Sequence, residues 1–385
     1  TDSMLKLGWQ PNPSHRTMLK LGYTQFHANE SYLGLNEMDF AADPYSRYSA
    51  SRFDEIHAHQ SRLLLTHTWK PSDSFEMVLK VYRNRFHRNW YKLDKVNGTT
   101  LSRAILRDSE DYETVIGAAA GELKVKANNR DYLSSGIHWI SQWTLDQGRL
   151  LNEIEAGVLF HQDSIRRYQH ADIYGQNDTG ATTGILRVSG PDSEGNRKQV
   201  SKIATVYVLD EIRWDSLTLK PGVRYELIDW DYFRSDGRDP DQVADGNYST
   251  LAPGISFIQQ FNPALSGFGG YHVGISPVSP SAARSGLEEE RSKSLELGLR
   301  YSENAWNAEF VFFNTRYDNL ITAESIANGG HDANIGEASV QGLEWMLNVD
   351  LFQLSNPDSR ARLLLEISGT YTEAEILDPS DGQSD

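Results

Sequence analysis

The chain has 385 residues, no cysteine and a formal net charge of −16. The absence of cysteine excludes a disulfide scaffold and a thiolate metal site, and the acidic charge disfavours binding to nucleic-acid phosphates. No run of about 18 apolar residues occurs, which excludes a transmembrane helix.

Alternation of apolar and polar residues is the main pattern along the chain. For example, Leu295, Leu297 and Leu299 fall on one face of a strand, and Glu296 and Arg300 fall on the other. A helical period would mix these two sets. About fourteen segments follow the pattern, each near the length that a tilted membrane strand needs. In chain order they are 3–9, 17–27, 58–69, 75–90, 133–144, 150–163, 201–213, 217–231, 247–258, 265–276, 290–301, 306–319, 334–352 and 361–374.

The connections between these segments alternate between short and long. The short turns fall near 10–16, 70–74, 145–149, 214–216, 259–264 and 302–305. The long loops fall at 28–57, 91–132, 164–200, 232–246, 277–289 and 320–333. Strict alternation puts every long loop at one end, as in outer-membrane barrels with short periplasmic turns and long extracellular loops. The sequence therefore predicts an all-β fold, a transmembrane antiparallel β-barrel.

Tryptophans flank several of the short turns, at Trp9, Trp69, Trp143 and Trp214. Tryptophan favours a membrane–water boundary because it has an apolar body and one N–H donor. These four residues predict an aromatic girdle at the periplasmic end. The alternative is that they are ordinary aromatic residues at strand ends.

The charges in the segment 290–301 indicate which face of the sheet looks outward. An arginine at the midplane of a barrel's lipid face costs roughly 2–4 kcal/mol. We therefore expect the leucine face to point outward and Glu296 and Arg300 to line a wet interior. Pro221 lies inside another predicted strand and predicts a bulge or a local irregularity there, and Asp210 breaks the alternation around 204.

Two groups of basic residues are candidates for binding an anionic ligand, because arginine pairs well with carboxylates. The first group follows one strand toward its loop end and comprises Arg83, Arg85, His87 and Arg88. Parity puts Arg83 and Arg85 on the same face as Met77, so contact with lipopolysaccharide phosphates or water is the alternative. The second group lies in the first long loop and comprises Arg47 and Arg52. For these two, stabilisation of the loop is the alternative.

Other motifs point to no metal site and no catalytic site. His57 and His59 share a strand face, but no third metal ligand is evident, so we expect them on a polar lumen face. The acidic loop 235–246 lacks the spacing of an EF-hand, and loose calcium binding there remains an alternative. The glycine run 267–274 does not match a dinucleotide-binding fingerprint. We expect neither a cofactor nor enzymatic activity.

Eight longer stretches carry a resemblance to a known family. They are YLGLNEMDFAADPYSRYSASRFD (32–54), VYRNRFHRNWYKLD (81–94), LTLKPGVRYELID (217–229), LAPGISF (251–257), GYHVGISPVSPS (270–281), RSKSLELGLRY (291–301), FFNTRYDNLI (312–321) and NIGEASVQGLEW (334–345). Together they resemble TonB-dependent outer-membrane receptors, and specifically their ferric-citrate-receptor-like branch.

This resemblance implies a barrel of 22 strands with a globular plug inside. Residues 1–385 would form part of the barrel domain, and the plug and the closing strands have no counterpart in the sequence. The implied protein sits in the outer membrane of a Gram-negative bacterium, among lipid and lipopolysaccharide. It would import an iron chelate, such as ferric citrate or another siderophore, with energy from the TonB–ExbB–ExbD complex.

Three alternatives remain at this point. A passive porin shares the strand alternation and the loop asymmetry. A receptor of the same family could carry a non-iron ligand, such as cobalamin, a sugar or another metal. A soluble all-β binding module or repeat lyase would instead pack its leucine faces inward.

Overall fold

Fourteen long antiparallel strands dominate the computed structural model, which describes residues 1–190, 193–235, 243–322, 333–334, 336–356 and 360–378. They are β1 (Asp2–Asn12), β2 (His15–Ala28), β3 (Glu55–Ser72), β4 (Phe75–Val96), β6 (Gly121–Asp146), β7 (Leu150–Arg167), β10 (Asn196–Trp214), β11 (Leu217–Ser235), β12 (Val243–Gln260), β13 (Leu265–Ser276), β14 (Glu290–Glu303), β15 (Trp306–Asp318), β18 (Glu337–Asp350) and β19 (Leu364–Asp378). Each coincides with one of the predicted segments, so the predicted all-β class is confirmed.

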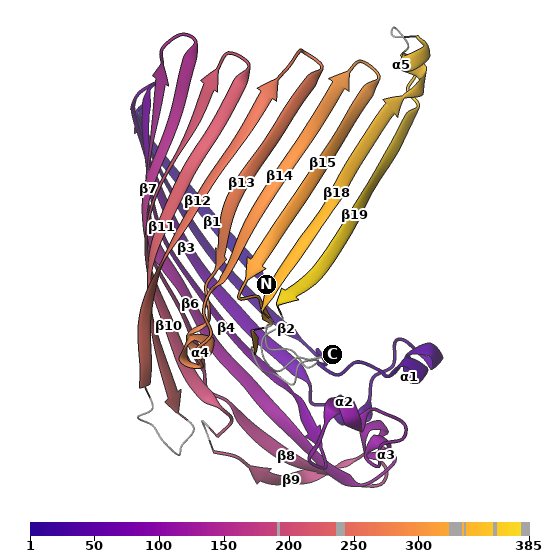
Figure 1. The fold of residues 1–385 in the computed structure, drawn as a ribbon. Coiled ribbons are helices and arrows are strands. Elements are labelled where there is room, and N and C mark those ends of the chain that lie inside the picture. Colours follow the sequence, from indigo (N-terminus) through magenta and orange to yellow (C-terminus); the bar gives the residue numbers. More distant parts are fainter. Residues whose placement is uncertain (191–192, 236–242, 323–332, 335, 357–359, 379–385) are drawn as a thin grey trace.

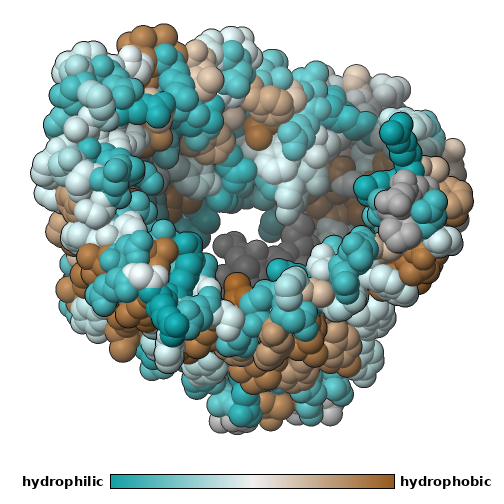
Figure 2. All heavy atoms as spheres, turned by 90° about the horizontal axis from the view of Figure 1, so that it is seen from above, coloured by the Kyte–Doolittle hydropathy of each residue, from teal (hydrophilic) through white to brown (hydrophobic). Residues whose placement is uncertain are grey.

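Each long strand pairs antiparallel with the next long strand along the chain, from β1–β2 through to β18–β19. The long strands belong to one 17-stranded sheet, together with β5 (Thr99–Thr100), β8 (His170–Gln176) and β9 (Thr182–Val188). The sheet curves around a central opening (Figures 1 and 2). The strands are tilted and side by side, as the wall of a barrel requires.

The connections divide between the two ends of the sheet. Tight turns join the strands at the upper end of Figure 1, and two of them place Asp215 and Asn304 at positive φ. One connection at this end is longer, because α5 (Leu351–Ser355) lies between β18 and β19. The predicted segregation of short turns from long loops is confirmed.

The long loops at the other end carry most of the remaining structure. The helices there are α1 (Glu37–Ala42), η1 (Ser49–Ser51), α2 (Leu101–Ala104), α3 (Tyr112–Ile116) and α4 (Pro280–Arg284), while β16 (Ile321–Thr322) and β17 (Ala333–Asn334) form a separate pair. A small apolar core joins the first two long loops to the ends of β4 and β6; it comprises Tyr48, Ala50, Leu93, Val96, Ala104, Val115 and Leu123. No helix in the described part of the chain is long and apolar enough to cross a membrane.

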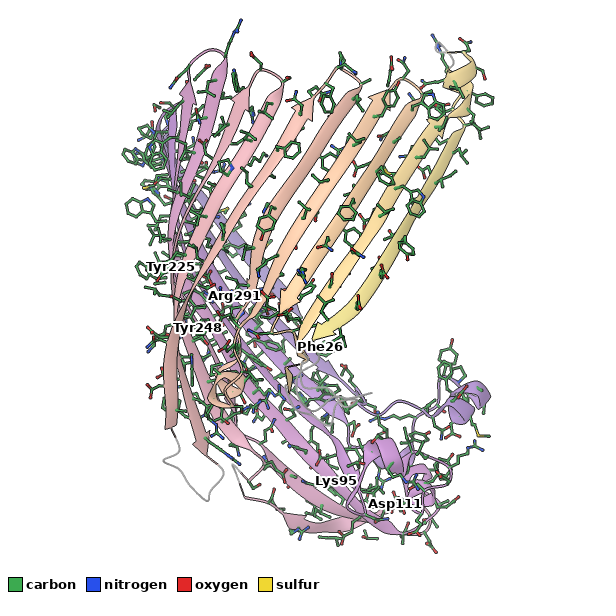
Figure 3. The ribbon with its side chains drawn as sticks, viewed as in Figure 1. Phe26, Lys95, Asp111, Tyr225, Tyr248 and Arg291 are labelled. Atoms are coloured by element: carbon green, nitrogen blue, oxygen red, sulfur yellow. The ribbon has the colours of Figure 1, made fainter. Side chains whose placement is uncertain are left out.

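The outer face of the sheet is apolar along the middle of the strands. Leu295, Leu297 and Leu299 are between 38% and 53% exposed there, as the alternation predicts. Hydrophobic residues colour much of the periphery in Figure 2, and hydrophilic residues border much of the central opening. In Figure 3, Tyr225 of β11 marks the outer face beside Leu251, and Tyr248 of β12 lies on the inner face. We call the outer stripe the apolar belt.

The four turn-flanking tryptophans all have exposed side chains on this outer face near the tight turns. Trp9 and Trp214 are the most exposed, at 65% and 60%. The register places Trp9 opposite Thr17 and Trp143 opposite Phe75. Trp143 thus lies next to the end of the apolar belt. The predicted clustering of tryptophan at the turn end is therefore confirmed.

The structure corrects two predictions about local geometry. Of the two outcomes predicted for Pro221, the bulge is absent, because the register with β10 is the same on both sides of it, and the local irregularity is present as an interruption of the pairing, since proline lacks an N–H donor. His57 and His59 do not face the lumen. Unbroken alternation along β3 places them on the outer face with the exposed Leu63 and Leu65.

Candidate functional site: an arginine row on the inner face

Five arginines occupy one transverse row on the inner face of the sheet. Consecutive members are direct partners across neighbouring strands, one each from β4, β6, β7, β10 and β11. The pairs are Arg88–Arg130, Arg130–Arg167, Arg167–Arg197 and Arg197–Arg234. We call this set the arginine row.

Alternation along β4 fixes the direction of the row. Arg88 lies on the opposite face of the strand from Arg83 and Arg85, and Arg83 pairs with the outward-facing Leu63. Like charges in such a line repel one another, and adjacent strands lie only about 4.8 Å apart. The row therefore places five guanidinium groups on the lumen side of the wall, on the side of the apolar belt where the long loops lie.

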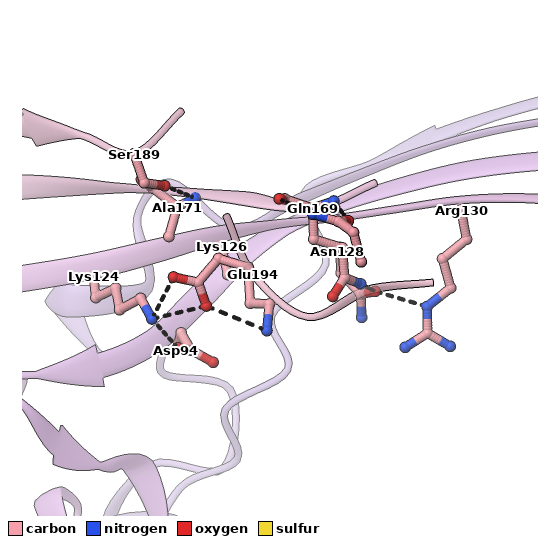
Figure 4. Close-up of polar contacts among 10 residues, drawn as sticks. Asp94, Lys124, Lys126, Asn128, Arg130, Gln169, Ala171, Ser189 and Glu194 are labelled. Carbon is pink, nitrogen blue, oxygen red and sulfur yellow. Dashed lines mark hydrogen bonds and ion pairs between the residues drawn. The ribbon is translucent and has the colours of Figure 1, made fainter. Parts of the chain in front are cut away.

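Neighbouring side chains position the members of the row. Arg130 donates through Nε to Asn128 Oδ1 at 2.8 Å, and Gln169 donates to the same oxygen (Figure 4). Arg197 donates through Nη1 to Ser281 Oγ in α4 at 3.2 Å. The Nε atom of Arg88 is buried, and no hydrogen-bond partner for it occurs among the described residues. An oxygen ligand would complete that donor.

Further cations extend from the row toward the loops. Lys92 and Lys126 are direct partners on β4 and β6. Burial lowers the pKa of Lys92 to about 8, and Lys126 and Arg88 add to this effect while Asp94 opposes it. Lys92 lies beyond the apolar belt, with its Nζ 3.1 Å from the ring centroid of a loop tyrosine, Tyr32.

Two carboxylates neutralise the next lysines, as Figure 4 shows. Glu194 approaches Lys124 at 2.9 Å and Lys126 at 3.6 Å, and Asp94 approaches Lys124 at 3.3 Å. The charges of Lys124 and Lys126 are thus offset locally by Glu194 and Asp94.

A pocket of about 530 Å³ lies directly below the arginine row, toward the turn end. Its lining includes Phe86, which precedes Arg88 by two residues, and Tyr132, which follows Arg130 by two, so both share the face of the row. The two aromatic rings lie 5.6 Å apart. The rest of the lining is mostly neutral and polar, with one carboxylate; these residues are Gln60, Asn84, Leu133, Ser134, Asp163, Ser164, Ile165, Gln199, Ser201 and Pro280. The arrangement suits a polar anion held between an arginine rim and a floor of aromatic groups and hydrogen-bond donors.

The structure divides the basic cluster predicted on β4. Arg88 faces the lumen as part of the arginine row, whereas Arg83, Arg85 and His87 lie on the outer face. The side chain of His87 lies outside the lumen, and its Nδ1 is 2.9 Å from Asp131 Oδ1 on that outer face. A ligand inside the ring therefore reaches only Arg88 of these four.

The two arginines predicted in the first long loop are engaged within the loop region. Arg47 donates to Ser51 Oγ at 3.1 Å and to the Asp54 carbonyl oxygen at 3.2 Å. Arg52 holds the loop against the β8–β9 hairpin through a forked contact with Gln176 Oε1 at 2.9 and 3.0 Å. These contacts favour the loop-stabilising interpretation.

Four members of the arginine row escaped the sequence analysis, namely Arg130, Arg167, Arg197 and Arg234. All four lie beyond the predicted ends of their strands, because β6, β7, β10 and β11 continue past the apolar belt. The sequence pattern that could have revealed them is one arginine at the same distance from the turn in each of several consecutive strands. The acidic loop 235–246, suggested above as a calcium site, lies mostly outside the described residues.

Comparisons with known proteins agree with this architecture. A family model for TonB dependent receptor-like, beta-barrel proteins matches residues 8–384. Among solved structures, the chain is similar to the ferric citrate transporter FecA in its unliganded form, with 19% identity, a TM-score of 0.72, and coverage of 97% of this chain and 51% of that chain.

Two other solved structures show the same likeness. The ferric-catecholate import receptor Fiu from E. coli K12, in its closed form, is 13% identical with a TM-score of 0.68, and the match covers 99% of this chain and 58% of that one. The siderophore receptor PiuA from Acinetobacter baumannii is 12% identical with a TM-score of 0.68, and the match covers 97% and 56%. At these identities the likeness shows the fold, and this chain spans about half the length of each solved structure.

Proposed function

The chain belongs to the TonB-dependent receptor β-barrel family, and we propose that it forms the wall of an outer-membrane importer for an anionic iron chelate. As a family, these receptors bind iron chelates and work with TonB–ExbB–ExbD. For this protein we propose the same energy-coupling complex, a plug domain inside the barrel, and further strands that complete the barrel.

The arginine row is the observation that carries the proposal. Five guanidinium groups in one line on the inner face present forked donors, which match carboxylates in geometry and charge. A carboxylate-rich chelate such as ferric citrate fits this chemistry. A neutral sugar would gain little from so much positive charge, and desolvating the arginines would disfavour it.

Import by this route needs binding and a conformational change, with no covalent chemistry. The chelate would enter from the loop end, contact the arginine row, and rest in the pocket below it. The family and its structural neighbours are receptors and transporters rather than enzymes. We accordingly propose that the protein has no catalytic activity and no resident cofactor in the lumen.

The outer face supports the outer-membrane assignment. A groove of about 650 Å³ lies there at the loop-side edge of the apolar belt. Val81, Ile137 and Phe160 line its apolar part, and Arg83, Lys202 and Asp229 line its polar part. Lys202 is paired with Asp231 at 3.5 Å, which leaves Arg83 as the main cation of the groove. An acyl chain and a phosphate would match these two parts, as lipopolysaccharide supplies. We therefore propose that Arg83 contacts the surrounding lipid.

Tryptophan fluorescence titration of the full-length receptor in detergent tests the proposed ligand class. Ferric citrate, an uncharged ferric hydroxamate and cobalamin are added to separate samples of protein that remains heat-modifiable on a gel. The proposal predicts saturable quenching by ferric citrate or another carboxylate chelate, weakened by added salt. Quenching by the uncharged hydroxamate or cobalamin alone would reject the anionic chelate. A passive porin would quench with none of them.

A further inference from the structure

Two histidines and a glutamate meet at the neck of the first long loop, on the outer face of the sheet. His27 is the penultimate residue of β2, and Glu55 and His57 are the first and third residues of β3, so the loop 29–54 leaves and returns beside them. We infer that these three side chains form a binding site for a first-row divalent metal ion such as Zn²⁺. The inference is independent of the proposed import function, because the site lies outside the lumen.

The strand register brings the three side chains together. His27 and His57 are direct partners across β2 and β3, and their rings stack 4.1 Å apart with an interplanar angle of 12°. Glu55 precedes His57 by two residues and therefore points to the same face. One ligand atom from each of the three residues lies within 4.8 Å of the other two.

The distances distinguish metal coordination from direct hydrogen bonding. His57 Nε2 lies 3.4 Å from Glu55 Oε1, and His27 Nε2 lies 3.7 Å from Glu55 Oε2. Good N–H···O bonds are about 2.7–3.2 Å long, so neither contact is one. Two ligand atoms on a tetrahedral zinc ion, each about 2.1 Å from the metal, lie roughly 3.4 Å apart. The three groups are thus spaced more widely than hydrogen-bonded partners, and their ligand atoms are close enough to share an ion.

The chemistry of the three groups selects the class of metal. Imidazole nitrogen suits Zn²⁺, Ni²⁺ and Cu²⁺, whereas Ca²⁺ and Mg²⁺ prefer sites made of oxygen alone. The side chains of His27, Glu55 and His57 are 54%, 43% and 53% exposed, which leaves room for water to complete the coordination. Two nitrogens and one carboxylate also match the ligand number of zinc sites that keep an open position.

The position of the site suggests what a bound ion would do. The ion would join the loop end of β2 to the loop end of β3, and so fix the base of the loop that carries Tyr48 and Ala50 into the small apolar core. Closing a long loop with a metal reduces the conformational freedom of the open state. The ion would therefore stabilise the loop without blocking the lumen.

A second histidine pair provides an internal comparison. His15 Nδ1 lies 3.4 Å from His67 Nε2 near the turn end of the same strands. His67 is also engaged by Thr17, whose Oγ1 lies 2.9 Å from His67 Nδ1. Among the described residues, the only group of three or more potential metal ligands is the one at the loop neck. We expect this pair to bind metal more weakly than the site at the loop neck.

Calorimetric titration of the full-length receptor in detergent with ZnCl₂ tests the inference, and CaCl₂ is the control ion. The wild-type protein should bind one Zn²⁺ tightly and no Ca²⁺ at this site. His27→Ala and His57→Ala should weaken that binding by more than the ~10–100-fold that loss of an outer-shell partner costs, and Glu55→Gln should weaken it less. His59→Ala, which removes an imidazole from the same face two residues away, should leave it unchanged.

Two further readouts separate the metal site from a structural effect of the substitutions. With one equivalent of Cu²⁺, the electron paramagnetic resonance spectrum should show coupling to two nitrogens in the wild type and to one in His57→Ala. Zn²⁺ should slow protease cleavage of the loop 29–54 in the wild type and in His67→Ala, but not in His57→Ala. Equal zinc affinity in the wild type and in His57→Ala, with both proteins heat-modifiable, would overturn the inference.

Discussion

Replacing Arg130 by glutamine probes the arginine row at a member flanked on both sides. Arg130 pairs with Arg88 on one strand and with Arg167 on the other. Adjacent strands are about 4.8 Å apart, so the whole row spans roughly 19 Å. A small chelate can therefore contact only part of the row at once, and Arg130, the second of the five members, is involved wherever the chelate sits over β4, β6 and β7.

The expected effect follows from the energy of one charge-assisted contact. A hydrogen bond to a charged group contributes about 1.5–3 kcal/mol, so Arg130→Gln should raise the Kd of a carboxylate chelate by roughly 10- to 150-fold. The difference should shrink at high salt, because the site is open to solvent ions. Glutamine keeps a donor and much of the side chain's length, so the variant chiefly removes the charge.

The assay is the fluorescence titration of the full-length receptor, with Arg85→Gln as the matched control. Arg85 is the same residue type on the adjoining strand, but it lies on the outer face. The Arg85→Gln variant should have the wild-type Kd within the error of the titration, because a charge on the far side of the wall, screened by water and salt, contributes little to chelate binding. An unchanged Kd in Arg130→Gln, or an equal loss in both variants, would refute the assignment of the arginine row.

Three further predictions concern the belt, a loop contact and a lysine. Leu297→Arg on the outer face should lower the free energy of unfolding of the barrel by roughly 2–4 kcal/mol in urea titrations in lipid vesicles. Ser294→Arg on the inner face should not lower it. Equal losses in both variants would contradict the assignment of the leucine face to the outside. A hydrogen bond from Tyr48 and contacts from Arg107 and Tyr112 lower the pKa of Asp39 to about 2. The interaction of Asp39 with these partners stabilises the loop fully above about pH 4 and is lost as the pH falls through about 2. Pepsin cleavage of the loop should therefore accelerate only between about pH 4 and 2. Acceleration that begins near neutral pH would count against this role of Asp39. Burial lowers the pKa of Lys92 to about 8, so anionic chelate binding should weaken between about pH 7 and 9 in the wild type but less in Lys92→Arg; superimposable pH profiles would show that Lys92 plays no part.

The fourteen long strands were predictable because a membrane-facing wall imposes alternation on the sequence. Along the apolar belt one face meets apolar surroundings and the other lines the lumen, so residues such as Leu295 and Glu296 alternate clearly. Beyond the belt both faces are polar, and the alternation disappears although the strands continue. For this reason the ends of β6 and β7 were underestimated, and Arg130 and Arg167 were assigned to loops.

Contacts between strands were harder to predict than the strands themselves. His57 alone gives no reason to expect a metal ion, since its partner His27 is separated from it by the whole loop 29–54. Only the register between β2 and β3 brings the two rings together. The same is true of the arginine row, whose members come from five strands and form a line only when every hairpin register is known.

Other predictions failed or held for local reasons. Parity correctly placed Arg83 and Arg85 outward, because β4 continues without a register shift from the belt to those residues. The expectation of a lumen face for His57 and His59 was wrong, although the same parity argument applied from Leu63 and Leu65 would have excluded it. The helices and the β8–β9 hairpin of the long loops left no periodic signal, because each is too short to bury a continuous stripe.

Uptake of radioactive iron into intact cells tests the central claim most directly. Cells that produce only this receptor would be compared with cells lacking it, with and without a functional TonB, using ferric citrate and an uncharged ferric hydroxamate as iron sources. The account predicts receptor-dependent uptake from the carboxylate chelate that is abolished without TonB and reduced by Arg130→Gln. Uptake that persists without TonB, or that occurs only from the uncharged chelate, would contradict it.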